Sequence, residues 1–147
     1  MTYKIKSLNQ IDEPTAKELL DIWERSVRAT HDFLTEQDIR SIHPLVVEGL
    51  HHVTLLGCYE NNSLRAFAGI SADKLEMLFV DPDYLGRGLG RALVTYMKAN
   101  HGVRYVDVNE QNASALRFYE RMGFIIFDRS ELDGQGNPFP ILHMKLQ

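Results

Sequence analysis

Three alternating glycines in the second half of the chain constrain its fold more than any other feature. The segment DPDYLGRGLGRALV, residues 81–94, carries Gly86, Gly88 and Gly90. A strand-like apolar run, KLEMLFV, precedes it, and the helix-like run RALVTYMKAN begins inside it. Glycine lets backbone amides approach a ligand closely, and the first amides of a helix have no intrahelical partner. The segment therefore predicts a strand–loop–helix unit that binds an anion such as a pyrophosphate.

Other glycine-rich loops fit this segment less well. A P-loop needs Gly-Lys-Ser/Thr at its end, and Arg91 follows Gly90. A dinucleotide fingerprint fits Gly86 and Gly88, with Asp107 at about the distance of a ribose-binding acid. However, Arg91 replaces its third glycine, and too few residues follow to build a doubly wound sheet. A flexible turn without ligand is a further alternative, although each glycine costs up to ~1 kcal/mol of stability relative to alanine.

Hydrophobic periodicity along the whole chain predicts an α/β fold with a mixed sheet. The expected order of elements is β-α-α-β-β-β-α-β-α-β-β. Strand patterns cover residues 3–8, 52–60, 64–71, 74–80, 103–108, 124–132 and 140–146, and helix patterns cover 14–31, 34–42, 91–100 and 112–123. Thr15 and Glu18 form a potential capping box for the first helix, and Thr35 is the expected cap of the second. Pro44 is expected to interrupt or kink that second helix.

Length and composition restrict the class of protein. With 147 residues, the chain is expected to form one domain, residues 1–147. A net charge of −4 argues against a nucleic-acid partner and favours a cationic small partner. No apolar run approaches the ~20 residues of a membrane helix, so no membrane partner is expected. The first ten residues lack the apolar stretch of a signal peptide, and we therefore expect a cytoplasmic protein, monomeric or homodimeric.

Cysteine and histidine give no sign of a metal site. Cys58 is the single cysteine, and its position inside a strand favours core packing over a role as acyl carrier. His51 and His52 are adjacent and do not share one face of a helix, and the other histidines show no ligand spacing. We expect no metal.

Two motifs together resemble a known family. The segment LFVDPDYLGRGLGRAL is followed by VNEQNASALRFYERMGF, which contains the pattern N-x-x-A-x-x-x-Y-x-x-x-G-F from Asn112 to Phe124. This pair, in this order, resembles the GNAT superfamily of acetyl-coenzyme A dependent N-acetyltransferases, most closely a small bacterial branch of it. The segment WERSVRATHDFLTEQDI extends the resemblance to the whole chain. It implies a single mixed, mostly antiparallel sheet of about six to seven strands, flanked by helices, with splayed central parallel strands.

The resemblance also implies where acetyl-coenzyme A would bind. The pantetheine arm would lie in the gap between the strands EMLFV and RYVDV and pair with backbone groups, as an added strand does. The pyrophosphate would bind amides of the glycine loop, and the start of the next helix would supply a further contact. The expected coenzyme-binding residues are Leu78, Phe79, Val80, Gly86, Arg87, Gly88, Leu89, Gly90, Arg91, Asn112 and Tyr119.

One position departs from the family pattern R/Q-x-x-G-x-G/A. Leu85 stands where the family usually carries Arg or Gln, so a charged hydrogen-bond partner worth about 1.5–3 kcal/mol when buried is missing. Arg87 or Arg91 can compensate, and the backbone cradle itself is unaffected.

The implied reaction is attack of an amine on a thioester, which sets requirements for the side chains. A lysine-type amine has a pKa of about 10.4, so its neutral form costs roughly 4.6 kcal/mol at pH 7, and a base should help remove the proton. Tyr119 occupies the family's proton-donor position and is the expected general acid, with core packing as the alternative. Glu76 is expected on one sheet face with Leu78 and Val80. It is the candidate general base, directly or through water, and a solvated or salt-bridged glutamate is its alternative.

The acceptor amine would meet the first two helices. Trp23, His31 and Phe33 are the expected acceptor-binding residues, although core packing is the alternative for Trp23. An aromatic ring can hold a cation, and a histidine can accept its proton. The favoured function is therefore an N-acetyltransferase that moves the acetyl group to a primary amine of a small molecule or peptide in a ternary complex. A non-catalytic acyl-coenzyme A binding module on the same fold is the alternative.

Overall fold

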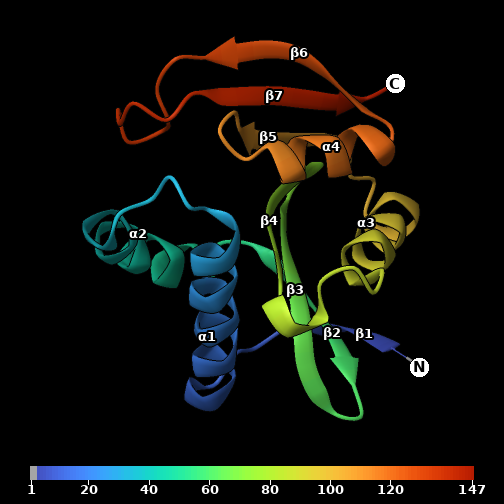
Figure 1. Cartoon of the computed structure of the whole chain (residues 1–147). Helices are drawn as coiled ribbons and strands as arrows, with labels where there is room; N and C mark the ends of the chain where they lie inside the picture. Colours follow the sequence, from blue (N-terminus) through green and yellow to red (C-terminus); the bar gives the residue numbers. More distant parts are fainter. Residues whose placement is uncertain (1–2) are drawn as a thin grey trace.

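The computed structural model describes residues 3–147, which form one mixed sheet of seven strands flanked by four α-helices (Figure 1). The strands are β1 (Tyr3–Leu8), β2 (Thr54–Glu60), β3 (Ser63–Ser71), β4 (Lys74–Val80), β5 (Tyr105–Asn109), β6 (Phe124–Ser130) and β7 (Ile141–Leu146). The helices are α1 (Glu13–Thr30), α2 (Glu36–Gly49), α3 (Leu89–Asn100) and α4 (Ala113–Arg121), with a 3-10 turn, η1 (Pro82–Tyr84), before the glycines. The expected order of strands and α-helices and the α/β class are confirmed.

The central parallel pair of strands opens along its length. The sheet order is β1-β2-β3-β4-β5-β7-β6, and every neighbouring pair is antiparallel except β4 and β5. These two strands pair only at Lys74 with Tyr105 and at Leu75 with Val106. Beyond Leu75 the edge of β4 that faces β5 has no strand partner. The expected splay of the central parallel strands is confirmed.

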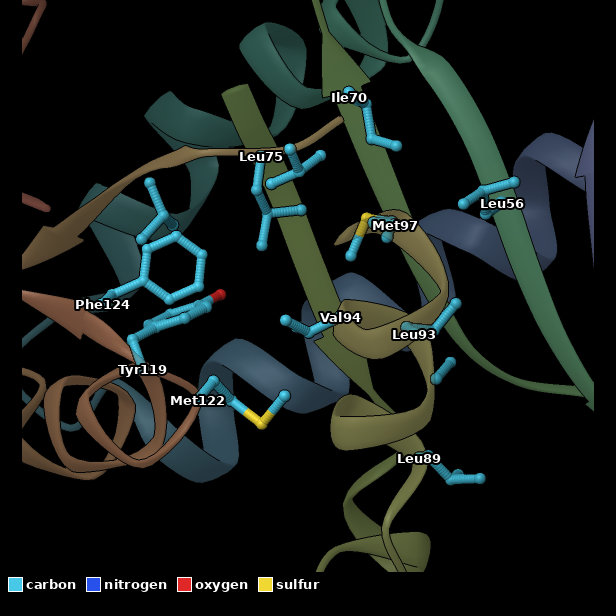
Figure 2. Close-up of a cluster of buried hydrophobic side chains, with 14 of the residues drawn as sticks. Leu56, Ile70, Leu75, Leu89, Leu93, Val94, Met97, Tyr119, Met122 and Phe124 are labelled. Carbon is cyan, nitrogen blue, oxygen red and sulfur yellow. The ribbon is translucent and has the colours of Figure 1, made fainter. Parts of the chain in front are cut away.

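Helices cover both faces of the sheet and bury two clusters of side chains. Figure 1 shows α1 and α2 on one side of β3 and β4, with α3 on the other. One cluster lies under α3 and α4 and includes Leu93, Met97 and Phe124 (Figure 2). The other lies under α1 and α2 and includes Trp23 and Phe67. Both clusters reach β4, which therefore separates the two helical layers.

One prediction about helix ends is wrong, and one is confirmed. Asp12 caps α1, since its Oδ1 accepts the amide of Thr15 at 2.9 Å, and the expected Thr15–Glu18 capping box does not form. The Asp12 carboxylate makes the same kind of N-cap hydrogen bond that was expected from Thr15, about one helical turn earlier in the chain. Thr35 caps α2 as predicted, paired with Asp38 in a capping box. That helix continues through Pro44 to Gly49, so Pro44 does not end it, and the alternative of a kink at Pro44 stays a prediction.

The pairing of β4 with β3 contains a bulge at Glu76. Ile70 of β3 pairs with Leu75, whereas the preceding Gly69 pairs with Met77, which leaves Glu76 without a partner on β3. A bulge breaks the simple alternation of side chains along a strand. The pairing of β3 with β4 is regular from Met77 to Val80, so the bulge interrupts the alternation between Leu75 and Glu76, and the shared face of Glu76 with Leu78 and Val80 stays a prediction.

Candidate active site

Two adjoining clefts occupy the place where β4 and β5 diverge. The larger cleft, about 390 Å³, extends from β4 to the glycine loop and α3. The smaller cleft, about 140 Å³, lies between β4 and β5. Six residues line both clefts and mark their junction: His31, Leu78, Phe79, Asn112, Ala115 and Tyr119. The geometry suits an elongated ligand that reaches from the glycine loop to the gap between the strands.

The glycine loop leaves one end of the larger cleft open to an anion. Gly86 and Gly88 have φ angles of 76° and 84°, a region that other residues rarely adopt, and a Cβ at either position would meet no atom within 4 Å. Gly88 is the N-cap of α3 and supplies no side-chain bond to the helix. The first amides of α3 therefore remain available, as a pyrophosphate would require. Gly90 has a different role, since a Cβ there would lie 3.3 Å from the Phe118 ring of α4.

The cationic side chains of the loop differ in position. Arg91 lines the larger cleft, as does Leu85, which is half exposed. Arg87 lines neither cleft, and its guanidinium lies 4.6 Å from the centre of the Tyr84 ring. Arg65 also lies on that ring, at 4.3 Å. Of the two arginines expected to compensate for Leu85, Arg91 is therefore the one already beside the cleft.

Tyr119 projects from α4 to the junction of the clefts. Figure 2 shows its ring beside Phe124, and the two ring centres lie 5.7 Å apart in an edge arrangement. The ring is 7% exposed, and within residues 3–147 no group hydrogen-bonds to its hydroxyl. Burial raises the pKa of the Tyr119 phenol well above its ordinary value, because the phenolate would lose its hydration. The side chain therefore stays protonated and has a hydrogen-bond donor free for a ligand.

Carboxylates line the smaller cleft. The exposed Glu76 lies there, together with Asp107 of β5. Asp107 accepts hydrogen bonds from Lys74 at 2.6 Å and from His143 Nδ1 at 2.7 Å, and His143 Nε2 lies 2.7 Å from Ser130 Oγ. This side of the cleft is therefore polar and carries acidic groups.

The hydrogen-bonded network around Asp107 was not predicted from the sequence. Asp107 alternates with the buried Val106 and Val108, so the pattern indicates that its side chain points away from the α3–α4 cluster. The connectivity Ser130–His143–Asp107 matches that of a hydrolase triad. However, neither Ser130 nor His143 lines a cleft, so the network braces Asp107 rather than adding a nucleophile to the site.

The three expected acceptor residues occupy three different environments. His31 caps α1 and lines both clefts. Phe33 lines neither, but its ring packs between His31, at 5.4 Å, and Phe139 of the β6–β7 loop, at 6.0 Å. Trp23 is 2% exposed in the α1–α2 core and makes an edge contact with the ring of His43. Of the three residues only His31 lines the two clefts, and Phe33 packs against the His31 ring from outside them.

Comparison with known proteins identifies the family. Residues 51–126 match the family described as the acetyltransferase (GNAT) domain. The chain belongs to this GNAT family of N-acetyltransferases, and the expected enzyme class is confirmed.

Relatives match nearly the whole chain. Peptidyl-lysine N-acetyltransferase YjaB of Escherichia coli (strain K12) is 36% identical over 139 residues, which cover 94% of this chain and 95% of the relative. The solution structure of apo-form YjaB from Escherichia coli has a TM-score of 0.88 at 34% identity and covers 99% of this chain and 97% of that one. The PaiA N-acetyltransferase from Thermoplasma acidophilum in complex with coenzyme A shares the fold, with a TM-score of 0.75 at 19% identity, covering 100% and 99% of the two chains. No helix within residues 3–147 is long and apolar enough to span a membrane.

Proposed function

We propose that this protein transfers the acetyl group of acetyl-coenzyme A to the ε-amine of a lysine side chain in a peptide or protein. The observation that carries the proposal is the pair of joined clefts, with the glycine loop at one end and acidic side chains at the other. The lysine acceptor is inferred from the named activity of the YjaB relative, which matches nearly the full length of the chain.

The larger cleft is proposed to hold the coenzyme. The free amides at the start of α3 and the Arg91 guanidinium suit the pyrophosphate. The unpaired backbone edge of Leu78, Phe79 and Val80 suits the amides of the pantetheine arm, which would pair with it as a strand does. When bound, acetyl-coenzyme A supplies the thioester. Asn112, at the start of α4, lines both clefts and is the proposed contact nearest the reacting end.

The smaller cleft is proposed to admit the acceptor. Its carboxylates, Glu76 and Asp107, attract a lysine ammonium, and the aromatic rim of Phe33 and Phe139 borders the approach from the helical side. Tyr119, at the junction, donates a proton or a hydrogen bond to the leaving sulfur. Glu76, the base expected from the sequence, and His31, which lines both clefts, are the two groups positioned to take the proton of the amine.

A pair of peptides tests the acceptor. One peptide has a single lysine and a blocked N-terminus, and the other has a free N-terminus and norleucine in place of that lysine. Thiol release from acetyl-coenzyme A and mass spectrometry of the products report the reaction. We expect acetylation of the first peptide only. Acetylation of the N-terminus alone, or of small polyamines and neither peptide, would contradict the lysine assignment.

A further inference from the structure

A continuous path of hydrogen bonds connects α1 to α4 at the junction of the clefts. Thr30 Oγ1 lies 2.8 Å from the carbonyl of Ser26 and 2.8 Å from His31 Nδ1. On the other edge of the ring, His31 Nε2 lies 3.3 Å from Asn112 Nδ2. Asn112 Oδ1 in turn accepts the amide of Ala115 at 3.1 Å and caps α4. The imidazole is thus held at both nitrogens.

The partners fix which nitrogen of His31 carries the proton. Asn112 uses its oxygen to cap α4, so its amide nitrogen is the group that faces His31 and donates to Nε2. Thr30 gives its single hydroxyl proton to the Ser26 carbonyl and therefore accepts a proton from Nδ1. The neutral ring has its proton on Nδ1 and its lone pair on Nε2.

His31 lies at the junction of the clefts, where the proposed function would bring the thioester and the amine together. His31 and Tyr119 both line the two clefts, so a base and an acid flank their junction. The contact of Asn112 with Nε2 is longer than the 2.9–3.0 Å typical of N–H donors and is correspondingly weak. An amine entering the junction can therefore replace Asn112 as the donor to Nε2.

The environment keeps His31 uncharged near neutral pH. Burial lowers the pKa of the imidazole, and the negative charge of Asp32 opposes this effect only in part. A neutral imidazole is ready to accept a proton. The other charged or titratable groups that line the clefts are Glu76 on β4, Tyr84 on η1, Arg91 on α3, Asp107 on β5, and Tyr119 and Arg121 on α4.

We propose that His31 Nε2 is the catalytic base and that Thr30 is the positioning residue that sets its tautomer. This inference rests on the proposed function. As the neutral amine attacks the thioester carbonyl, the C–N bond forms, the C–S bond breaks, and the proton lost by nitrogen passes to Nε2. The leaving thiolate receives the proton of the Tyr119 hydroxyl. Proton exchange through water between the imidazolium and the Tyr119 phenolate returns both groups to their starting forms.

Glu76 is less suited to the same task. It lines the smaller cleft only and is exposed, so water solvates its carboxylate. An imidazole is ordinarily about two pH units more basic than a glutamate carboxylate. Glu76 therefore attracts the ammonium form of the acceptor, whereas His31 takes the proton during bond formation.

The test compares variants of the full chain with an acetylatable amine, by thiol release between pH 5 and 9. His31→Gln keeps an amide near the position of Nε2 and should lower kcat by ~10²–10⁴-fold, the usual contribution of a general base. Thr30→Val should lower kcat about tenfold, and Thr30→Ser, which keeps the hydroxyl, should restore it. His52→Gln, an exposed histidine outside both clefts, is the control and should match the wild type. Coenzyme A Kd should stay within about twofold in every variant.

The pH profile separates a catalytic role from a structural one. Below the pKa of His31, both the imidazole and the acceptor amine must lose a proton, so log(kcat/KM) of the wild type should rise steeply with pH. Above that pKa only the amine must lose a proton, so the rise should be shallower. That extra slope should be absent in His31→Gln and present in Glu76→Gln. In Thr30→Val, nitrogen–proton correlation spectra should show a proton on His31 Nε2 in part of the molecules.

If the steep part of the pH profile survives in His31→Gln and disappears in Glu76→Gln, the proposal is wrong, although the proposed acetyl transfer stands. If the wild type neither binds coenzyme A nor releases thiol, the proposed function itself fails.

Discussion

Arg25 of α1 holds both carboxylate oxygens of Asp81, at 2.9 and 3.2 Å, directly before the turn that leads into the glycine loop. Asp81 also accepts the amide of Asp83 in that turn, and its side chain is 4% exposed. Burial raises the pKa of the Asp81 carboxyl, but the Arg25 pairing, the amide of Asp83 and the charge of Arg65 together outweigh burial and hold the pKa below its usual range. The helix on the acceptor side is thereby tied to the start of the proposed pyrophosphate loop.

The Arg25–Asp81 ion pair predicts that two aspartate substitutions lower the free energy of unfolding by different amounts. Arg25 also pairs with Asp21, which is 64% exposed. Asp81→Asn should reduce the free energy of unfolding by about 2 kcal/mol, less than the ~3–5 of a fully buried pair because Arg25 is 39% exposed. Asp21→Asn should change it by less than about 0.5 kcal/mol. Urea unfolding measures both, and equal losses would show that the Asp81 pair has no special role.

Gly88 should be required for coenzyme binding, as distinct from folding. Gly88→Val places a side chain where the first amides of α3 face the cleft, so the thermal stabilisation by acetyl-coenzyme A, about 2.7 kcal/mol at 100 times Kd, should vanish. Gly136→Val is the matched control, because Gly136 has a similar φ of 78° and open surroundings but lies in the β6–β7 loop. Both variants should lose comparable stability from backbone strain. A ligand-induced shift that persists in Gly88→Val would remove the loop from the coenzyme site.

Tyr119→Phe should retain binding and lose rate. The ring still fills its place beside Phe124, so the fold and coenzyme Kd should change little. Loss of the proton donor should lower kcat by ~10²–10⁴-fold. Calorimetry and thiol release measure the two quantities separately, and an unchanged kcat would leave Tyr119 with a packing role only.

Leu85→Arg should tighten coenzyme binding. Leu85 lines the larger cleft and is 51% exposed, so a guanidinium there can reach a phosphate and stays largely hydrated. We expect a gain of no more than about 1–2 kcal/mol, because exposure weakens the pair and Arg91 already lines the cleft. Calorimetry with coenzyme A decides, and an equal or larger Kd would show that backbone amides suffice.

Protein stability should depend on pH through His31. Burial lowers the pKa of the His31 imidazole in the folded protein below its ordinary value of about 6.5. At pH values between these two pKa values, the unfolded chain binds more protons than the folded protein. The contribution of neutral His31 to the free energy of unfolding is therefore complete above the ordinary pKa. It declines as the pH falls toward and through the lowered pKa of the folded protein. Urea unfolding at pH 5.5 and 7.5 should show a larger loss for the wild type than for His31→Gln. Equal losses would mean that His31 titrates as in water.

The sequence predicted local structure better than long-range contacts. The glycines, the Asn112–Phe124 motif and period-two or helical patterns are each contained in short segments, so their elements appeared in the right order. The bulge at Glu76 depends on the register of a neighbouring strand, which alternation within β4 does not encode. The His31–Asn112 contact joins positions 81 residues apart, and Asp107 meets His143 only after β5 and β7 have paired. These pairings require the assembled sheet.

A crystal structure with coenzyme A would show whether the gap between β4 and β5 is the acetyl-transfer site, by the position of the coenzyme sulfur. We expect the pyrophosphate on the amides of Leu89 to Arg91 and the pantetheine arm along β4. The sulfur should lie within hydrogen-bond reach of the Tyr119 hydroxyl and close to His31 Nε2. A coenzyme bound outside the gap between β4 and β5, or a sulfur remote from Tyr119, would contradict this expectation.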